Sequence, residues 1–299
     1  MIKNFSVSIV IPNFNGEELL KKNLPTLIKA SEIRENRIKE IIVVDDKSKD
    51  GSIDLLKKDF SEVKLIIHRK NRGFSESVNL GVRSAKGELI CLLNTDVSVT
   101  SDFLKSVFFF FKDPFTFAVS LHEKGYGGAI GKFDQGFIVH QGKKEVDRPV
   151  ATFWVNGGSG VFSRSIWFKL GGFDGRLFSP FYWEDLDLSY RALKAGYKIY
   201  WDPNSLVFHE HEATIKKIKR TKREGIQQRN QLLFIWKNLT SNQLMRKHIL
   251  GLFKRLLKHP GYLKVIFLAL VKMPMVLKSR RKVKKFFKVS DEAIFANFR

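Results

Sequence analysis

The sequence predicts an α/β fold, with a doubly wound, mostly parallel sheet and a basic, helical C-terminal region. Two observations predict this fold. Over residues 1–215, short apolar runs rich in β-branched residues alternate with segments of helical periodicity, as in strands joined by helical crossovers. Beyond this point only helical periodicity continues, and lysine and arginine become abundant. We therefore expect two regions, residues 1–215 and residues 216–299.

The expected elements of the first region begin with a strand from Val7 to Ile11, which Pro12 stops. There follow a helix from Glu17 to Ala30, a strand from Glu40 to Val44, a helix from Ser52 to Phe60, a strand from Val63 to Ile67, a helix from Glu76 to Ala85 and a strand from Glu88 to Leu93. Phe117 to Val150 shows weak periodicity and is expected to form hairpins and loops over the sheet. A helix from Glu184 to Ala195, which Gly196 ends, and a strand from Lys198 to Trp201 complete the region.

The second region carries nearly all of the net charge. The whole chain has a formal charge of +23, and Lys216 to Lys288 holds 22 Lys or Arg against the single acid Glu224. We expect two apolar-faced helices there, Ser241 to His259 and Tyr262 to Leu277, with Pro260 and Gly261 between them. The chain is thus a near-neutral body with a basic appendage.

The remaining composition points to a reducing compartment. Cys91 is the only cysteine, so no disulfide can form within the chain, and its apolar surroundings predict a buried thiol. The N-terminus is typical of a core strand and not of a signal peptide. The apolar stretch from Tyr262 to Leu277 is interrupted by Lys264, Lys272 and Pro274, and falls short of the ~20 apolar residues that a membrane span needs.

Polar groups follow several apolar runs. They are Asp45-Asp46 after Ile41 to Val44, Asn94-Thr95-Asp96 after Leu89 to Leu93, Glu184-Asp185, and His209 after Ser205 to Phe208. Loops at the carboxyl ends of strands in an open α/β sheet converge on one crevice. We therefore expect these groups to surround one ligand, and the residue types suit a metal-bound phosphate.

Each group also has a structural interpretation. Asp45 can accept a hydrogen bond from a pyrimidine imide or a ribose, or can form an Asx turn. Asp96 can bind Mg²⁺ or Mn²⁺ through oxygen, or can serve a turn. Glu184 and Asp185 begin a helix, where negative charge is favoured, and this would keep them ionised and able to act as a base; acids are also common there for structural reasons. His209 can complete a metal shell or can be structural.

Five blocks in order resemble the family 2 glycosyltransferases: VSIVIPNFNGEELLKKNLPTL, EIIVVDDKSKDGS, NRGFSESVNLGVRSAKGELICLLNTDV, GGFDGRLFSPFYWEDLDLSYRALKAGYKI and VFHEHEAT. The resemblance covers about Val7 to Thr214. It implies a GT-A type fold, with a Rossmann-like nucleotide-binding half and an acceptor half.

The resemblance implies a role for each matching residue. Pro12 and Asp45 would contact the nucleoside, Arg72 and Gly73 would border the nucleotide, and Asn94 and Thr95 would belong to the same site. Asp96 would bind the Mg²⁺ or Mn²⁺ that bridges the diphosphate, and His209, followed at the family's spacing by Thr214, would be the second metal ligand. Asp185 would be the general base, Glu184 would shape the acceptor site, and Trp154, Gly157 and Gly158 would line the acceptor side. Asn94 departs from the acid-x-acid form of the metal motif and adds no charge, which favours a lower metal affinity.

The implied activity is inverting transfer of a sugar from a nucleotide-diphosphate donor, dTDP-rhamnose or a UDP-sugar, to a glycan or lipid-linked acceptor in cell-surface polysaccharide synthesis. The basic helices predict peripheral contact with an anionic membrane surface, on the cytoplasmic face of the plasma membrane; packing of these helices on the body is the alternative. Two other functions are open: a nucleic-acid-binding protein that uses the basic region, although no recognisable binding motif accompanies it, and a sugar-phosphate nucleotidyltransferase, although PNFNGEE replaces the expected Gly-rich loop.

Overall fold

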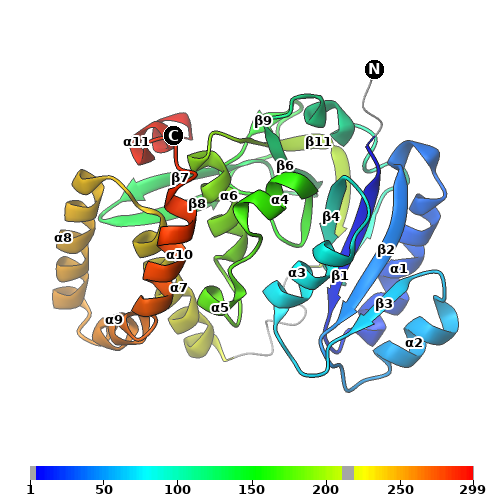
Figure 1. The fold of residues 1–299 in the computed structure, drawn as a ribbon, viewed down its shortest axis with the longest axis horizontal. Helices are drawn as coiled ribbons and strands as arrows, with labels where there is room; N and C mark the ends of the chain where they lie inside the picture. The colour runs from blue at the N-terminus through cyan, green and yellow to red at the C-terminus, as the bar shows by residue number, and fades with distance from the viewer. Residues whose placement is uncertain (1–4, 211–218, 299) are drawn as a thin grey trace.

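A nine-stranded sheet forms the centre of the molecule in the computed structural model, which describes residues 5–210 and 219–298 (Figure 1). The strand order is β3-β2-β1-β4-β10-β6-β11-β5, and β9 pairs with β11. Strands β10, β5 and β9 run opposite to the others, so the sheet is mixed but mostly parallel, as expected. The strands are β1 (Val7–Asn13), β2 (Ile38–Asp45), β3 (Lys64–Ile67), β4 (Leu89–Leu93), β5 (Val97–Val99), β6 (Thr116–Glu123), β9 (Val150–Ala151), β10 (Ser159–Ser163) and β11 (Lys198–His209).

Helices cover both faces of the nucleotide-binding half. Alternate residues of β1 point to opposite faces, as strand geometry requires. Ile9 packs in one apolar cluster with Leu24 of α1 (Glu17–Ser31) and Leu56 of α2 (Ser52–Asp59). Val10 packs in another with Val78 of α3 (Phe74–Ser84). The doubly wound arrangement is therefore confirmed.

The stretch expected to form only hairpins and loops contains a central strand, so that expectation is wrong for its first part. β6 lies between β10 and β11, and its residues Phe117 to Val119 are fully buried. The rest of the stretch does form a hairpin, of β7 (Ala129–Asp134) and β8 (Phe137–Gly142). A short apolar run buried on both faces has no alternation, and this hid the strand.

The remaining helices connect the sheet to the C-terminal region. They are the 3₁₀ helices η1 (Arg34–Asn36) and η2 (Val107–Lys112), then α4 (Arg164–Leu170), α5 (Gly175–Phe178), α6 (Glu184–Lys194), α7 (Arg220–Asn238), α8 (Asn242–Lys258), α9 (Tyr262–Leu270), α10 (Met273–Lys284) and α11 (Asp291–Asn297). The single helix expected from Tyr262 to Leu277 is two helices, because Pro274 in the first turn of α10 cannot continue the preceding one.

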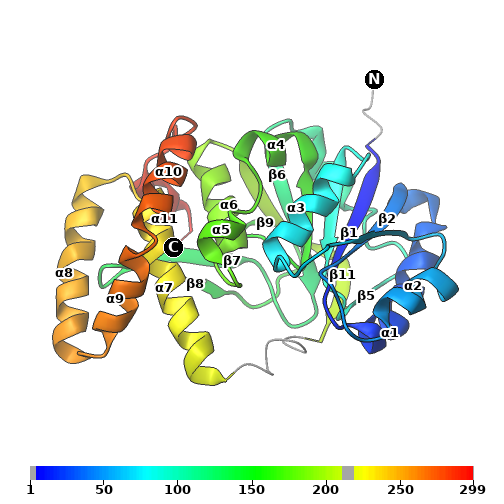
Figure 2. The same cartoon turned by 60° about the horizontal axis from the view of Figure 1, so that its bottom comes forward.

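The C-terminal helices lie at the end of the molecule opposite β1 to β3 and pack on the acceptor half (Figures 1 and 2). Their apolar residues share one core with α6 and the β7–β8 hairpin. Two buried ion pairs add to it: Lys237 of α7 with Asp187 of α6 at 2.9 Å, and Lys194 of α6 with Asp291 of α11 at 2.9 Å. Among the described residues, no helix has the length and apolar content to cross a membrane.

Candidate active site

The end of β2 places two carboxylates at the sheet edge. Asp45 is fully buried, and its carboxylate accepts hydrogen bonds from Asn13 Nδ2 (2.8 Å) and from Ser48 N (2.8 Å) and Oγ (2.6 Å). The turn-forming interpretation is thus realised, and base recognition by Asp45 stays a prediction. Pro12 lies beside this turn, because it pairs with Val44 of β2.

Asp46 holds the loop that carries two of the predicted nucleotide-binding residues. Its carboxylate accepts hydrogen bonds from the backbone N–H of Arg72 (2.6 Å) and of Gly73 (2.7 Å). Gly73 has φ +84°, a left-handed conformation that glycine adopts at low cost. The Arg72 side chain is exposed at the same edge as Asp45, where it can reach an anionic ligand.

The end of β4 carries the second polar group. The backbone N–H of Asn94 donates to the Gly158 carbonyl (2.9 Å), and the Asn94 side chain lies directly over Gly158. A Cβ on Gly158 would come within 2.3 Å of Asn94 Nδ2, so any larger residue here would displace the Asn94 side chain. The carbonyl of Thr95 accepts a hydrogen bond from Asn23 of α1 (2.9 Å), which fixes the turn that precedes Asp96.

Asp96 and His209 meet at the edge of the sheet, as predicted. His209 Nε2 lies 3.1 Å from Asp96 Oδ1, and His209 Nδ1 lies 2.9 Å from Glu123 Oε1. Burial alone would lower the pKa of His209, but the hydrogen bonds to Asp96 and Glu123 raise it to about 9. Thr214, predicted to follow His209 in the motif, lies outside the described residues.

This pair fits a divalent cation. A metal-ligating histidine usually donates its second ring N–H to a carboxylate, and Glu123 occupies that place. Nε2 then faces the carboxylate of Asp96, so that an ion can replace the proton between them. In the described part of the chain, no three His, Cys, Asp or Glu residues surround one ion position. The protein thus offers two ligands, and diphosphate oxygens and water would supply the others.

The segment from Asn156 to Gly158 connects the Asp96–His209 pair, through Glu123, to the predicted base. Asn156 Nδ2 donates to Glu123 Oε1 (2.8 Å), and the backbone N–H of Gly157 donates to Asp185 Oδ2 (3.3 Å). A Cβ on Gly157 would lie 3.4 Å from the Cβ of Asp185 and 3.2 Å from the Phe173 ring, so the backbone passes close to the base. Hydrogen bonds therefore connect residues from distant parts of the chain at the carboxyl ends of β6 and β11, where the sequence predicts the crevice.

The first turn of α6 presents two carboxylates in different environments. Glu184 is buried, and its Oε2 has no hydrogen-bond partner among the described residues. Burial and the neighbouring charge of Asp185 raise the pKa of Glu184 to about 8. Asp185 is partly exposed, and burial raises the pKa of this carboxyl too. The expectation that the helix N-terminus keeps both groups ionised stays a prediction, and the burial of Glu184 opposes it because burial disfavours the charged form.

The loop before α6 is strained and is held from the C-terminal region. Tyr182 (φ +73°) and Trp183 (φ +79°) both adopt the left-handed conformation, which costs about 1–3 kcal/mol for each non-glycine residue. The buried Nδ2 of Asn230 in α7 donates to the carbonyls of Phe178 (2.7 Å), Phe181 (3.0 Å) and Tyr182 (2.9 Å). A side chain of α7 thus fixes the backbone that leads into the predicted base.

Trp154 lines a hollow near the Asp96–His209 pair. The hollow has a volume of about 600 Å³, and its walls include Glu123, Asn156, Trp154 and His140. The rings of His140 and Trp154 meet edge to face with centroids 4.5 Å apart, and this contact holds the indole in place. The position is consistent with the acceptor-side role predicted for Trp154.

Three residues of this site were not predicted from the sequence. Glu123 follows an apolar run, as the other acids do, but the weak periodicity around it predicts loops instead of a strand. Asn156 immediately precedes Gly157 and Gly158, and only these two glycines were assigned a role from the sequence. Asn230 gives no local signal, because its partners lie about 50 positions away.

Comparison with known proteins identifies the family. The family model described as glycosyl transferase family 2 matches residues 8–164. A glucuronosyltransferase from Methanococcus voltae, named for a dolichyl N-acetylglucosaminyl phosphate acceptor, is 24% identical over 72% of this chain and 70% of its own length. The O-antigen chain rhamnosyltransferase of Salmonella typhimurium is 23% identical over 70% of this chain and 67% of its own.

The fold has solved counterparts. The crystal structure of GalNAc-T7 with UDP, GalNAc and Mn²⁺ superposes with a TM-score of 0.62 at 19% identity and covers 86% of this chain. The present chain spans 57% of that protein's length. This likeness confirms the GT-A type fold expected from the sequence, and the family match favours a glycosyltransferase over a nucleic-acid-binding protein or a nucleotidyltransferase. Because the family model covers more than half of the chain and the fold agrees with it, the chain belongs to glycosyl transferase family 2.

Proposed function

We propose that this enzyme is an inverting glycosyltransferase that moves a sugar from a nucleotide-diphosphate donor to a hydroxyl of a glycan or lipid-linked acceptor. One observation carries the proposal. Asp96, His209 and Asp185 come from three distant elements, yet Glu123, Asn156 and Gly157 link them through hydrogen bonds around one crevice. A nucleotide-sugar transferase needs this juxtaposition of diphosphate site and base.

Asp185 is the general base in this proposal. It is the more exposed of the two carboxylates, and burial raises its pKa, which makes it a stronger proton acceptor. The hydroxyl of the acceptor loses its proton to Asp185 and attacks the anomeric carbon as the nucleotide leaves from the opposite side. The configuration at that carbon inverts, and no covalent intermediate forms.

Asp96 and His209 would hold Mg²⁺ or Mn²⁺. Such an ion supplies neutralisation of the charge that develops on the leaving diphosphate. Support comes from the donor set, with Glu123 behind His209, and from the Mn²⁺ bound in the GalNAc-T7 crystal structure. Arg72, exposed at the same edge, adds a second positive charge toward the nucleotide.

The donor proposed from the sequence is dTDP-rhamnose or a UDP-sugar. Two similar proteins support this range, since one is named a rhamnosyltransferase and the GalNAc-T7 structure contains UDP. Asp45 would read the imide that uracil and thymine share. Pro12, Gly73, Asn94 and Thr95 complete the nucleotide site in this proposal.

The proposed setting is cell-surface polysaccharide synthesis at the cytoplasmic face of the plasma membrane, with the enzyme bound peripherally. The M. voltae relative is named for a lipid-linked acceptor, and the S. typhimurium relative for O-antigen synthesis. Trp154, Gly157 and Gly158 line the acceptor side, beside the 600 Å³ hollow. No nucleic-acid partner is part of the proposal.

A donor screen tests this function. The purified protein is incubated with individual nucleotide sugars and Mg²⁺ or Mn²⁺, and release of UDP or dTDP is measured. We expect metal-dependent release from one donor class, and loss of release in Asp185→Asn with nucleotide binding retained. Release that proceeds unchanged in excess chelator, or equally in Asp185→Asn, would contradict the proposed roles.

A further inference from the structure

Two C-terminal helices expose an extended apolar surface. In α8, Ile249, Phe253 and Leu257 recur at helical spacing with exposed fractions of 60%, 62% and 69%. In α9, Leu263 and Phe267 do the same at 59% and 64%, and Leu250, Leu270 and Val271 extend the two rows. We call these eight residues the α8–α9 apolar face. Monomeric soluble proteins rarely expose large apolar patches, so exposed apolar rows on two neighbouring helices indicate an interaction surface.

The opposite sides of the same helices are already packed. His248 of α8 is buried and bonds the Gly136 carbonyl through Nδ1 (2.7 Å), while Tyr262 and Ala269 of α9 lie in the core. Figures 1 and 2 show α8 and α9 side by side at the end of the molecule in both views. The inner sides of α8 and α9 already pack in the core. Core packing therefore does not explain the exposed apolar face.

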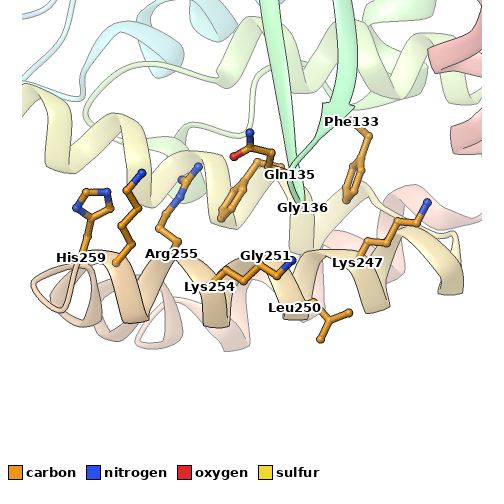
Figure 3. Close-up of a pocket in the computed structure, with 11 residues that line it drawn as sticks. Phe133, Gln135, Gly136, Lys247, Leu250, Gly251, Lys254, Arg255 and His259 are labelled. Atoms are coloured by element: carbon orange, nitrogen blue, oxygen red, sulfur yellow. The ribbon is translucent and has the colours of Figure 1, made fainter.

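The surroundings of this face are basic. Residues 242–288 contain 14 Lys or Arg and no Asp or Glu. On the flank of α8, Lys247, Lys254, Lys258 and His259 line a hollow of about 680 Å³ against the tip of the β7–β8 hairpin (Figure 3). Arg255 forms its wall, with its guanidinium 3.4 Å from the centroid of the Phe137 ring. Such a hollow suits a phosphate headgroup.

We propose that the α8–α9 apolar face inserts into the headgroup region of an anionic lipid bilayer, while the lysines on the flank of α8 contact the lipid phosphates. Apolar rows flanked by lysine and arginine bind membrane surfaces by apolar burial together with attraction to anionic lipid. A second copy of the chain is a poorer occupant, because two identical surfaces flanked by an excess of lysine and arginine repel each other. This inference rests on the peripheral location proposed above and not on the transfer reaction.

The structure also shows which residues cannot serve this contact. Ile266 of α9 and Met273 of α10 pack against the core, whereas Leu270 is exposed. Arg280 of α10 donates to the carbonyls of Trp236, Lys237 and Leu239 at the end of α7. Replacement of Arg280 would therefore disturb the fold, and the test must use the α8–α9 face itself.

The test compares two matched double variants of the full chain. Phe253→Ser with Phe267→Ser changes the apolar face, and Phe109→Ser with Phe115→Ser makes the same change at phenylalanines that are 70% and 58% exposed elsewhere. Binding is measured by co-sedimentation with vesicles of phosphatidylcholine alone and of phosphatidylcholine mixed with phosphatidylglycerol. Burial of one Phe side chain in the membrane should strengthen vesicle binding by roughly tenfold or more. We therefore expect the first variant to bind mixed vesicles at least about 100-fold more weakly than the wild type.

The control variant should bind mixed vesicles as the wild type does, and wild-type binding should weaken in neutral vesicles and in high salt. Donor hydrolysis should be the same in all three proteins, so failure of the proposed reaction is distinguished from failure of this inference. Wild-type binding by the Phe253/Phe267 variant, or no vesicle binding by the wild type, overturns it. A wild-type dimer in light scattering that the same variant abolishes, without vesicle binding, assigns the face to a protein interface instead.

Discussion

Replacement of Asn230 by Asp should slow catalysis from a position outside the crevice. The change keeps the shape of the side chain and its acceptor oxygen, which bonds Arg229 Nε (3.0 Å), but removes the N–H groups that reach the loop before α6. The carbonyls of Phe178, Phe181 and Tyr182 then face an oxygen. Because that loop ends at Glu184 and Asp185, a change in its path moves the base.

The magnitude follows from the hydrogen bonds lost. The amide carries two hydrogens, and each buried carbonyl left without a donor costs about 1–3 kcal/mol. The two left-handed residues, Tyr182 and Trp183, cost a similar amount, so the amide offsets much of the strain in the loop. Without it the loop relaxes, and a displacement of about 1 Å at a catalytic group lowers turnover about 100-fold. We expect kcat to fall by that order and the KM for donor to change much less, because the loop carries the base and not the nucleotide site.

The assay is donor hydrolysis, in which water takes the place of the acceptor, together with nucleotide binding by calorimetry. Gln231→Glu is the matched control, since Gln231 is the next residue of α7 and its amide donates to the Ile138 carbonyl of β8 (3.0 Å), away from the loop. The reasoning is refuted if Asn230→Asp loses stability but keeps wild-type kcat, or if both variants lose kcat equally.

Four further predictions concern the crevice. Asp185→Asn should leave donor binding nearly unchanged and reduce transfer below a few per cent, and higher residual turnover would remove it as the base. Asp96→Ala should abolish metal-dependent nucleotide binding, with a smaller loss in His209→Ala; binding that persists in both variants would exclude the metal assignment. Glu123→Gln should weaken metal affinity about 10–100-fold, because the carboxylate orients His209; an unchanged titration with Mn²⁺ would contradict this. Glu184 should lower the free energy of unfolding as pH rises from about 4.5 to about 8, because folding raises its pKa and its ionisation is then disfavoured in the native state; Glu184→Gln should therefore lose less stability than the wild type over this range in urea titrations.

The nucleotide-binding half was predictable because its central strands, β1 and β4, are buried on both faces and form unbroken apolar runs in the sequence. The polar residues that follow such runs must lie at the sheet edge, so Asp45 and Asp96 could be assigned to the crevice from the sequence. The same rule would have found Glu123 had β6 been recognised as a strand. Its run is short, and a glycine-rich hairpin follows it at once, which concealed the end of the strand.

The acceptor half was less predictable because its contacts are long-range. The helix at Glu184 was expected, but the high pKa of this residue comes from burial, which depends on packing by distant elements. The left-handed backbone conformation of Tyr182 and Trp183 could not be predicted, because neither residue is a glycine. Asn230 stabilises that backbone from a helix that the sequence placed in a separate region.

Formal charge was a poor guide to the surface of the C-terminal region, because its cations form two groups. Lys237 is 1% exposed and lies between Asp174 and Asp187, at 2.9 Å from each. Lys272 donates to the Leu177 carbonyl (2.7 Å), and burial lowers its pKa to about 8. Such cations stabilise the contact between the helices and the catalytic body and cannot also bind lipid. The salt dependence of vesicle binding should therefore follow Lys254 and Lys258, which are exposed beside the apolar face, and not the total charge of the region.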